Sequence, residues 1–225
     1  VIRSELILDE GDPFTDLALQ KSIAEIKQRN LFKEVNYEVL DTADNKKIIN
    51  INVEEKPTGE ISAGAGVGTN GGSFAFSISE NNWLGKGKRV DFALEVDQES
   101  LGGTLNYSDP NYNFLGNSIN YFISSEENDK PDQGFENSLI SAGINTGFEQ
   151  YKDFFTSLGV VASYDDLRTL SNASSSLKKQ SGNFSELAGE YGFKYDKRNR
   201  AFMPTSGTIL NFKQSPPIYA DKNFI

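Results

Sequence analysis

The spacing of apolar and polar positions changes once along this chain. Over residues 15–30 the apolar side chains recur at helical spacing, which predicts an amphipathic helix. A short apolar segment, Val1–Leu8, precedes it, and two strand-like runs, Glu34–Leu40 and Lys47–Val53, follow it. Together these elements predict a small α+β module over residues 1–57.

From Thr58 onward the apolar positions alternate, and no helical period returns. Alternation of this kind indicates strands with one apolar face. We therefore predict about nine antiparallel strands of about 9–11 residues within residues 58–225. The positions that share the apolar face include Ile61, Ala63, Ala65 and Val67, then Phe74, Phe76 and Ile78, and at the end Leu210 and Phe212.

The connections between these runs differ in length and composition. Short links such as Asn81–Asn82 and 149–152 alternate with longer polar segments at 126–134 and 165–183. The face opposite the apolar one is rich in Gly, Ser, Asn and Asp, as a water-filled interior requires. This pattern favours an antiparallel transmembrane β-barrel over the alternative, a soluble β-barrel or sandwich with a dry core.

A glycine-rich stretch opens the second part of the chain. Gly66, Gly68 and Gly71 have the G-x-G-x-x-G spacing of a dinucleotide-binding turn, which requires a helix immediately afterwards. The alternating run Ser73–Ser79 follows instead and predicts a strand. We interpret the stretch as two strands of a hairpin that turns at Thr69–Gly72, where Asn-Gly is a strong turn signal.

Composition removes most enzymatic chemistry. The chain has 225 residues, a net charge of −10 and a pI near 4.6, and it contains neither cysteine nor histidine. These features argue against a nucleic-acid partner, a thiolate or imidazole metal site and a histidine-dependent triad. We expect no catalytic residues and no cofactor. No apolar run is long enough for a transmembrane helix, and the first residue, Val1, suggests a piece of a longer protein.

One turn motif carries a family resemblance. The segment Glu80–Lys88, with the sequence ENNWLGKGK, resembles the N-N-x-L-G-x-G turn after the second barrel strand of the BamA family of outer-membrane insertases. Four further stretches resemble that family in the same order: Arg29–Val35 and Val53–Gly59 in and after its last POTRA repeat, and Tyr107–Tyr112 and Asp196–Gly207 in the barrel.

The resemblance implies a fold, a location and a function. Residues 1–57 would be a partial POTRA-like periplasmic domain, and residues 58–225 the N-terminal part of an outer-membrane β-barrel. The protein would fold and insert β-barrel proteins into the bacterial outer membrane. Its implied partners are unfolded β-barrel clients, periplasmic accessory lipoproteins and outer-membrane lipid, and not nucleic acid. The alternative function is a two-partner secretion translocator or a passive outer-membrane pore.

The resemblance also implies a site. In this family the first barrel strand meets the last at a weak seam, the lateral gate, where client strands would pair. The glycines would keep the seam weak, whereas the plainer explanation is that they permit strand curvature or fit a crowded interior. The strand contains Gly59, Ile61, Ala63, Gly64, Ala65, Gly66, Val67, Gly68 and Thr69.

The single tryptophan lies in the turn motif. We interpret Trp83, with Asn82, Leu84 and Gly85, as a turn with an anchor at the membrane interface. A role in thinning the bilayer beside the seam is the sharper alternative.

Overall fold

The chain forms two compact units in a computed structural model that describes residues 2–42, 46–68, 71–113, 115–199 and 203–221. The first unit comprises Val1–Gly59 and Glu80–Lys88, and the second comprises Glu60–Ser79 and Arg89–Ile225. The domain boundary between residues 57 and 58 stays a prediction.

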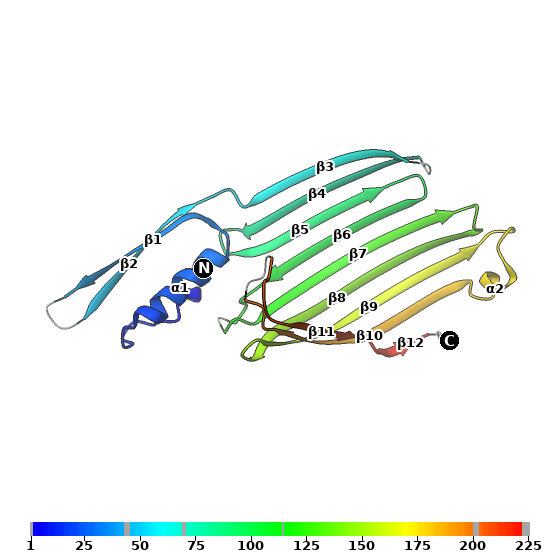
Figure 1. Cartoon of the computed structure of the whole chain (residues 1–225). Coiled ribbons are helices and arrows are strands. Elements are labelled where there is room, and N and C mark those ends of the chain that lie inside the picture. The colour runs from blue at the N-terminus through cyan, green and yellow to red at the C-terminus, as the bar shows by residue number, and fades with distance from the viewer. Residues whose placement is uncertain (1, 43–45, 69–70, 114, 200–202, 222–225) are drawn as a thin grey trace. The chain divides into compact units, whose positions relative to one another are not determined.

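The first unit combines helix α1 (Asp16–Gln28) with an antiparallel sheet of β1 (Phe32–Asp41) and β2 (Lys47–Glu55) (Figure 1). The helix begins where expected because Thr15 caps it, its Oγ1 accepting a hydrogen bond of 3.2 Å from the Ala18 N–H. The apolar N-terminal segment forms a short 3₁₀-helix, Arg3–Glu5. Within the described ranges, no helix is long and apolar enough to cross a membrane.

The core of this unit lies between α1 and its sheet. Leu19, Ile23 and Ile26 expose 4% or less of their surface and pack with Val35 of β1. Ser22 is fully buried among them, where its hydroxyl accepts a hydrogen bond from the Ile7 N–H and donates one to the Ala18 carbonyl, both at 2.9 Å. Ser22 therefore fastens the N-terminal segment to the helix.

The second unit is dominated by one sheet, and from β3 to β11 each strand lies beside the next strand along the chain (Figure 1). From β5 to β10 all neighbouring strands pair antiparallel, as predicted. A single helical turn, α2 (Ser175–Lys178), lies between β9 and β10 and was not expected. The strands are β3 (Gly59–Gly68), β4 (Gly71–Trp83), β5 (Lys88–Val96), β6 (Ser100–Asp109), β7 (Ser118–Lys130), β8 (Phe135–Tyr151), β9 (Phe154–Thr169), β10 (Gly182–Asp196), β11 (Ile209–Gln214) and β12 (Pro217–Ala220).

The last two strands occupy the same edge of β10. Tyr191–Asp196 pairs with β11, and Glu186–Ala188 pairs with β12. Ser215 and Pro216 interrupt the ladder between β11 and β12. The Gly189 N–H still donates a hydrogen bond of 3.0 Å to the Pro216 carbonyl. Proline has no N–H to give the ladder, so β12 follows β11 after a break, and the described sheet has ten strands where about nine were predicted.

The register gathers the predicted apolar positions on one face. Two rows of directly paired residues cross the sheet from β5 to β9 on this face. They are Phe92, Leu105, Ile123, Ala142 and Ala162, and Val90, Tyr107, Tyr121, Ile144 and Val160.

The strands are longer than predicted, and the expected alternation of short and long connections was wrong. β8 and β9 have 17 and 16 residues, and β7 and β9 extend through segments that were assigned to loops. The reason is that polar residues beyond the apolar belt still complete the backbone ladder. The longer connections at 110–117 and 170–181 therefore lie at opposite ends of the sheet, and not all at one end as the expected alternation requires.

Candidate functional site

Strand β3 forms one edge of the sheet. Within the described ranges its hydrogen-bonded neighbour is β4, and no strand lies on its other side. All its residues are exposed, and Ile61 and Val67 expose 72% and 93% of their surface. An edge of this kind presents unpaired N–H and C=O groups to another strand. Thr69, the last residue of the predicted gate strand, lies outside the described residues.

Packing within this chain does not require glycine at positions 64 and 68 of β3. A Cβ added at Gly64 or Gly68 would meet nothing within 4 Å, and one at Gly66 would lie 3.1 Å from the Ser73 Oγ. None of the three has a positive φ. By contrast, a Cβ at Gly143 in β8 would lie 2.4 Å from the Phe122 ring. Crowding therefore explains glycine in the middle of the sheet but not at positions 64 and 68.

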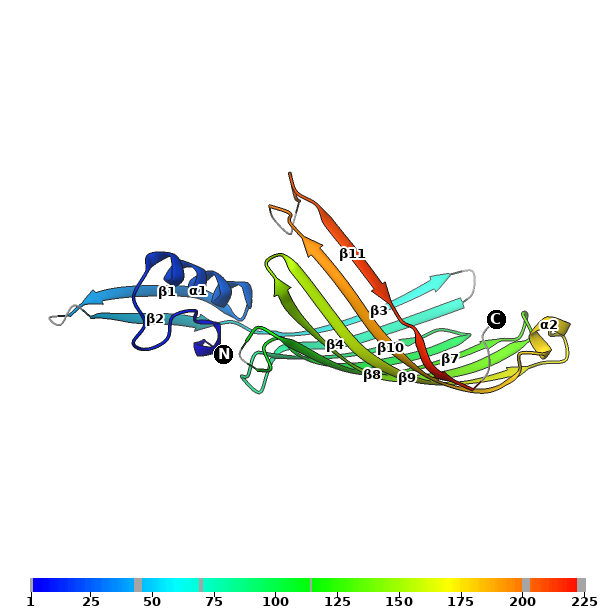
Figure 2. The same ribbon diagram turned by 90° about the horizontal axis from the view of Figure 1, so that it is seen from below.

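The sheet is a single curved layer (Figure 2), and its apolar face is the more exposed one. Ile123 and Ile140 on that face expose 50% and 46% of their surface, whereas Phe122 and Ser141 on the other face are half-buried. Among the described residues of its strands, the buried side chains are Ala188 and Thr156. A continuous apolar face without a covering layer needs a non-aqueous neighbour.

The opposite face is polar. Thr104, Ser124, Ser141, Ser163 and Glu186 form one row across β6 to β10. Hydroxyls and carboxylates along such a row keep hydrogen-bonding partners when they contact water. Among the described residues, no cluster of three or more Asp or Glu is placed to hold a metal ion.

The turn after β4 is closed by its asparagine and its glycines. The Asn82 carbonyl accepts a hydrogen bond of 2.8 Å from the Gly85 N–H, and its Oδ1 accepts one of 2.7 Å from the Gly87 N–H. Leu84, Gly85 and Gly87 have φ angles of 55°, 70° and 64°. Glycine enters this left-handed region at little cost, which explains the N-N-x-L-G-x-G pattern.

Trp83 occupies the last position of β4 and exposes 45% of its surface. Side chains alternate along a strand, so Trp83 shares a face with Ser77 and Ser79, while Phe76 and Ile78 lie on the other face. Leu84, in the turn itself, exposes 75%. The role of this segment as a membrane-interface anchor stays a prediction.

The link from β2 into the sheet is bonded to the end of β4. The Thr58 hydroxyl donates a hydrogen bond of 2.5 Å to Glu80 Oε1, and this oxygen also accepts a hydrogen bond of 2.6 Å from the Asn82 N–H. The Thr58 carbonyl accepts hydrogen bonds from both the N–H and the side-chain amide of Asn81, each at 3.2 Å. Thr58 therefore holds the turn motif from one side.

Arg29, at the end of α1, also bonds to this turn, and it was not predicted as a site residue. Its guanidinium donates a hydrogen bond of 2.6 Å to the Gly87 carbonyl. The helical spacing predicts where α1 ends, but it carries no signal for a partner this distant in the chain.

Two other turns show why their residues are needed. Gly207, which ends the second barrel motif, has a φ of +106°, and an added Cβ would lie 2.2 Å from the Lys197 carbonyl oxygen. Residues 200–202 of that motif lie outside the described ranges.

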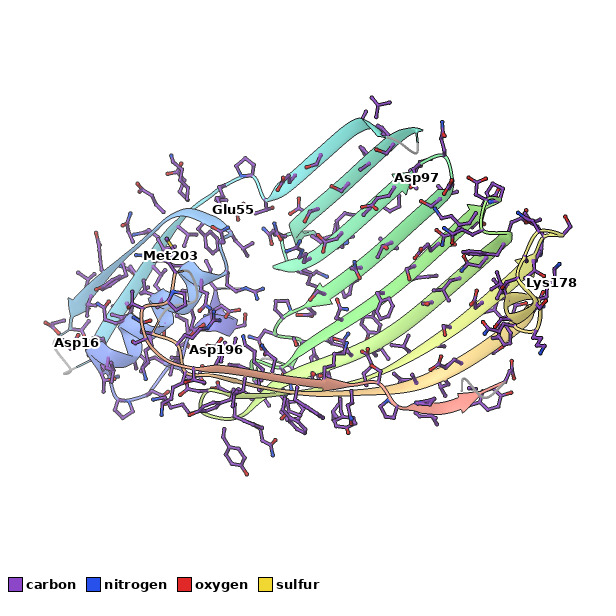
Figure 3. The ribbon with its side chains drawn as sticks, turned by 45° about the vertical axis from the view of Figure 1, so that its right-hand side comes forward. Asp16, Glu55, Asp97, Lys178, Asp196 and Met203 are labelled. Atoms are coloured by element: carbon purple, nitrogen blue, oxygen red, sulfur yellow. The ribbon has the colours of Figure 1, made fainter. Side chains whose placement is uncertain are left out.

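In the turn between β5 and β6, hydrogen bonds from the Ser100 hydroxyl and the Glu99 N–H lower the pKa of Asp97 (Figure 3).

Comparison with known proteins agrees with this architecture. The Omp85 superfamily domain matches residues 82–224. The chain is 27% identical over 94% of its length to the outer membrane protein assembly factor BamA of Neorickettsia risticii, and 24% identical over 93% to that of Neisseria meningitidis. It covers 29% of each of these relatives, so it spans less than a third of their length.

A solved structure shares the fold. The crystal structure of BamA from Haemophilus ducreyi lacking POTRA domains 1–3 superposes with a TM-score of 0.73 at 20% identity, covering 94% of this chain and 44% of that one. The predicted location, in the outer membrane with the N-terminal module in the periplasm, agrees with the names of the BamA relatives. The chain therefore belongs to the Omp85 superfamily, and its curated relatives assign it to the BamA family.

Proposed function

We propose that this chain is part of an outer-membrane protein assembly factor that folds and inserts β-barrel proteins through β3. The observation that carries the proposal is the exposed, glycine-containing edge strand beside a continuous sheet. The curated relatives bear the name of an assembly factor, which supports the same function.

The apolar face gives the proposal its physical setting. We propose that residues 58–225 form the first part of a transmembrane barrel whose apolar face contacts outer-membrane lipid. In hydrocarbon, each unpaired backbone N–H or C=O costs several kcal/mol, because no water is present to bond it. An edge strand that opens within the membrane is therefore driven to pair with an incoming client strand, by β-augmentation.

The glycines set how easily the seam opens. Glycine within a strand contributes little side-chain packing and loses more backbone entropy on ordering than other residues. Gly64 and Gly68 have open space around them, so a larger residue would fit. Their glycine identity is then best explained by a requirement for a weak strand.

The rest of the chain has supporting roles in this proposal. Residues 1–57 act as a partial POTRA-like domain that meets clients and accessory lipoproteins in the periplasm. Asn82, Trp83, Leu84 and Gly85 form the turn at the periplasmic membrane interface. The free energy for insertion comes from strand pairing and apolar burial, with neither catalytic residues nor a cofactor.

The alternative function is a two-partner secretion translocator or a passive pore. The row of hydroxyls on the polar face, from Thr104 to Ser163, favours it, since such a surface suits a water-filled passage. In a pore, however, β3 would stay paired with the last strand throughout the working cycle.

Site-specific photo-crosslinking in cells separates the two. A crosslinker replaces Ala63 or Ala65 in the full-length protein, and Ala142, on the apolar face of the mid-sheet strand β8, provides the matched control. An assembly factor gives crosslinks to the terminal strands of newly made barrel proteins from β3 and not from Ala142. Capture of the protein's own last strand alone would count against the gate.

A further inference from the structure

The turn between β4 and β5 is held by a side chain from its own compact unit. Glu80–Lys88 clusters with Val1–Gly59 and not with the sheet that β4 and β5 enter. Arg29 is the C-cap residue of α1, and its Nη2 donates 2.6 Å to the Gly87 carbonyl, across a separation of 58 positions. This bond supplements the link that Thr58 makes to Glu80.

The guanidinium of Arg29 is fixed in direction by burial and by charge. The side chains of Arg29 and Glu5 expose 17% and 11% of their surface, and the Arg29 Nε lies 3.5 Å from the Glu5 Oε1. Neither of these two atoms has a hydrogen-bond partner in the structure. Removing one partner of such a pair leaves a buried charge uncompensated, so Glu5 and Arg29 keep each other in place.

The acceptor of this bond, the Gly87 carbonyl, belongs to a turn that contains an unfavourable backbone conformation. Gly87 is buried, and its N–H is already bonded to Asn82. Leu84 adopts a φ of 55°, which is unfavourable for a residue with a branched side chain. The bond from Arg29 reaches the carbonyl of the last turn residue before β5.

We propose that Arg29 is a positioning residue that clamps the β4–β5 turn to α1, so that the helix and the end of β4 move as one body. Strand β4 is the hydrogen-bonded neighbour of the edge strand β3. The clamp therefore holds the strand against which β3 pairs. This last consequence rests on the proposed function of β3, whereas the clamp itself does not.

The test removes the clamp without leaving a buried charge. Glu5→Gln is made first, and Arg29→Met is added in that background, which keeps most of the side-chain length and loses the donor to Gly87. Amide hydrogen exchange is measured on the full-length protein in lipid nanodiscs. In the double variant, exchange at residues 84–88 is expected to accelerate about tenfold relative to the unsubstituted protein, because a charge-assisted bond to the turn is lost.

The comparison regions are α1 and the strands β7 and β8, where protection stays unchanged. Arg3→Met is the matched control, since Arg3 forms an exposed ion pair with Glu10 in the same unit; it leaves exchange at residues 84–88 unaltered. Equal exchange there in the unsubstituted protein and the double variant overturns the proposal. Loss of protection throughout α1 overturns it as well, because Arg29 would then support the helix. No client is present, so the result is independent of the assembly function.

Discussion

Replacing Gly64 and Gly68 by alanine is expected to stabilise the edge strand β3. A Cβ at either position meets nothing within 4 Å, so the substitution introduces no clash. Alanine is favoured over glycine within a strand by roughly 0.5–1 kcal/mol, chiefly through the entropy of the unfolded chain. Two such sites give about 1–2 kcal/mol relative to the unfolded chain, a factor of roughly 5–30 in the ratio of folded to unfolded strand.

Two measurements on the full-length protein follow this change. Thermal denaturation in detergent should occur at a higher temperature in the double variant, while pulse-labelled barrel clients should reach their folded form more slowly in cells. Gly159→Ala is the matched control in β9. Its Cβ would lie 2.8 Å from the Asn145 Cβ and 2.9 Å from the Ile144 carbonyl oxygen, so this variant should lose about 1–3 kcal/mol.

The two results refute different steps of the reasoning. If Gly64→Ala with Gly68→Ala lowers the denaturation temperature as Gly159→Ala does, the backbone of β3 requires glycine for its own conformation. If the double variant is more stable but clients assemble at the normal rate, the weakness of the seam has no part in assembly.

Three further predictions concern other parts of the chain. Ser22→Ala should destabilise the N-terminal unit by about 1–2 kcal/mol, because the partly buried Ile7 N–H loses its acceptor, and denaturant unfolding with a probe in that unit measures the loss. Gly207→Ala should disorder its turn, since the added Cβ would collide with the Lys197 carbonyl, and faster amide exchange at residues 203–208 would show it. The hydrogen bonds that lower the pKa of Asp97 stabilise the β5–β6 turn when the pH is above the ordinary aspartate pKa near 4. This contribution is lost as the pH falls through the lowered pKa. Exchange in that turn should therefore rise on acidification, and Asp97→Asn should abolish this pH dependence; an unchanged profile in the variant would contradict the assignment.

The elements that follow from local spacing were predictable. Helix α1 was expected from its apolar period and begins at its Thr15 cap. The apolar positions of the strands share one face, as their alternation requires, because side-chain direction is fixed by the backbone of each strand. The edge position of β3 needed more than periodicity, namely the motif of Glu80–Lys88.

Other features depend on partners that are distant in the sequence. The strand ends at Lys130 and Thr169 continue through polar residues, and only pairing with the neighbouring strand distinguishes them from loops. Glycine looks the same in sequence at Gly64 and Gly143, yet only the second is crowded by a side chain from a neighbouring strand. The contact of Arg29 with Gly87 likewise follows from tertiary structure and from no local pattern.

The unequal crowding of the two sheet faces has a consequence for how this chain can change by mutation. Side chains on the open apolar face, such as Ile123 and Ile140, have no shape to match, so other apolar residues can replace them at little cost. On the polar face, Gly143 meets a ring and Gly159 meets backbone atoms, so neither position admits even a methyl group without movement of its neighbours. On the apolar face, residues should therefore be replaced often, but only by other apolar residues. On the polar face, the size of the side chain should be the property that is kept. A water-soluble sheet that covers an apolar core shows the reverse pattern.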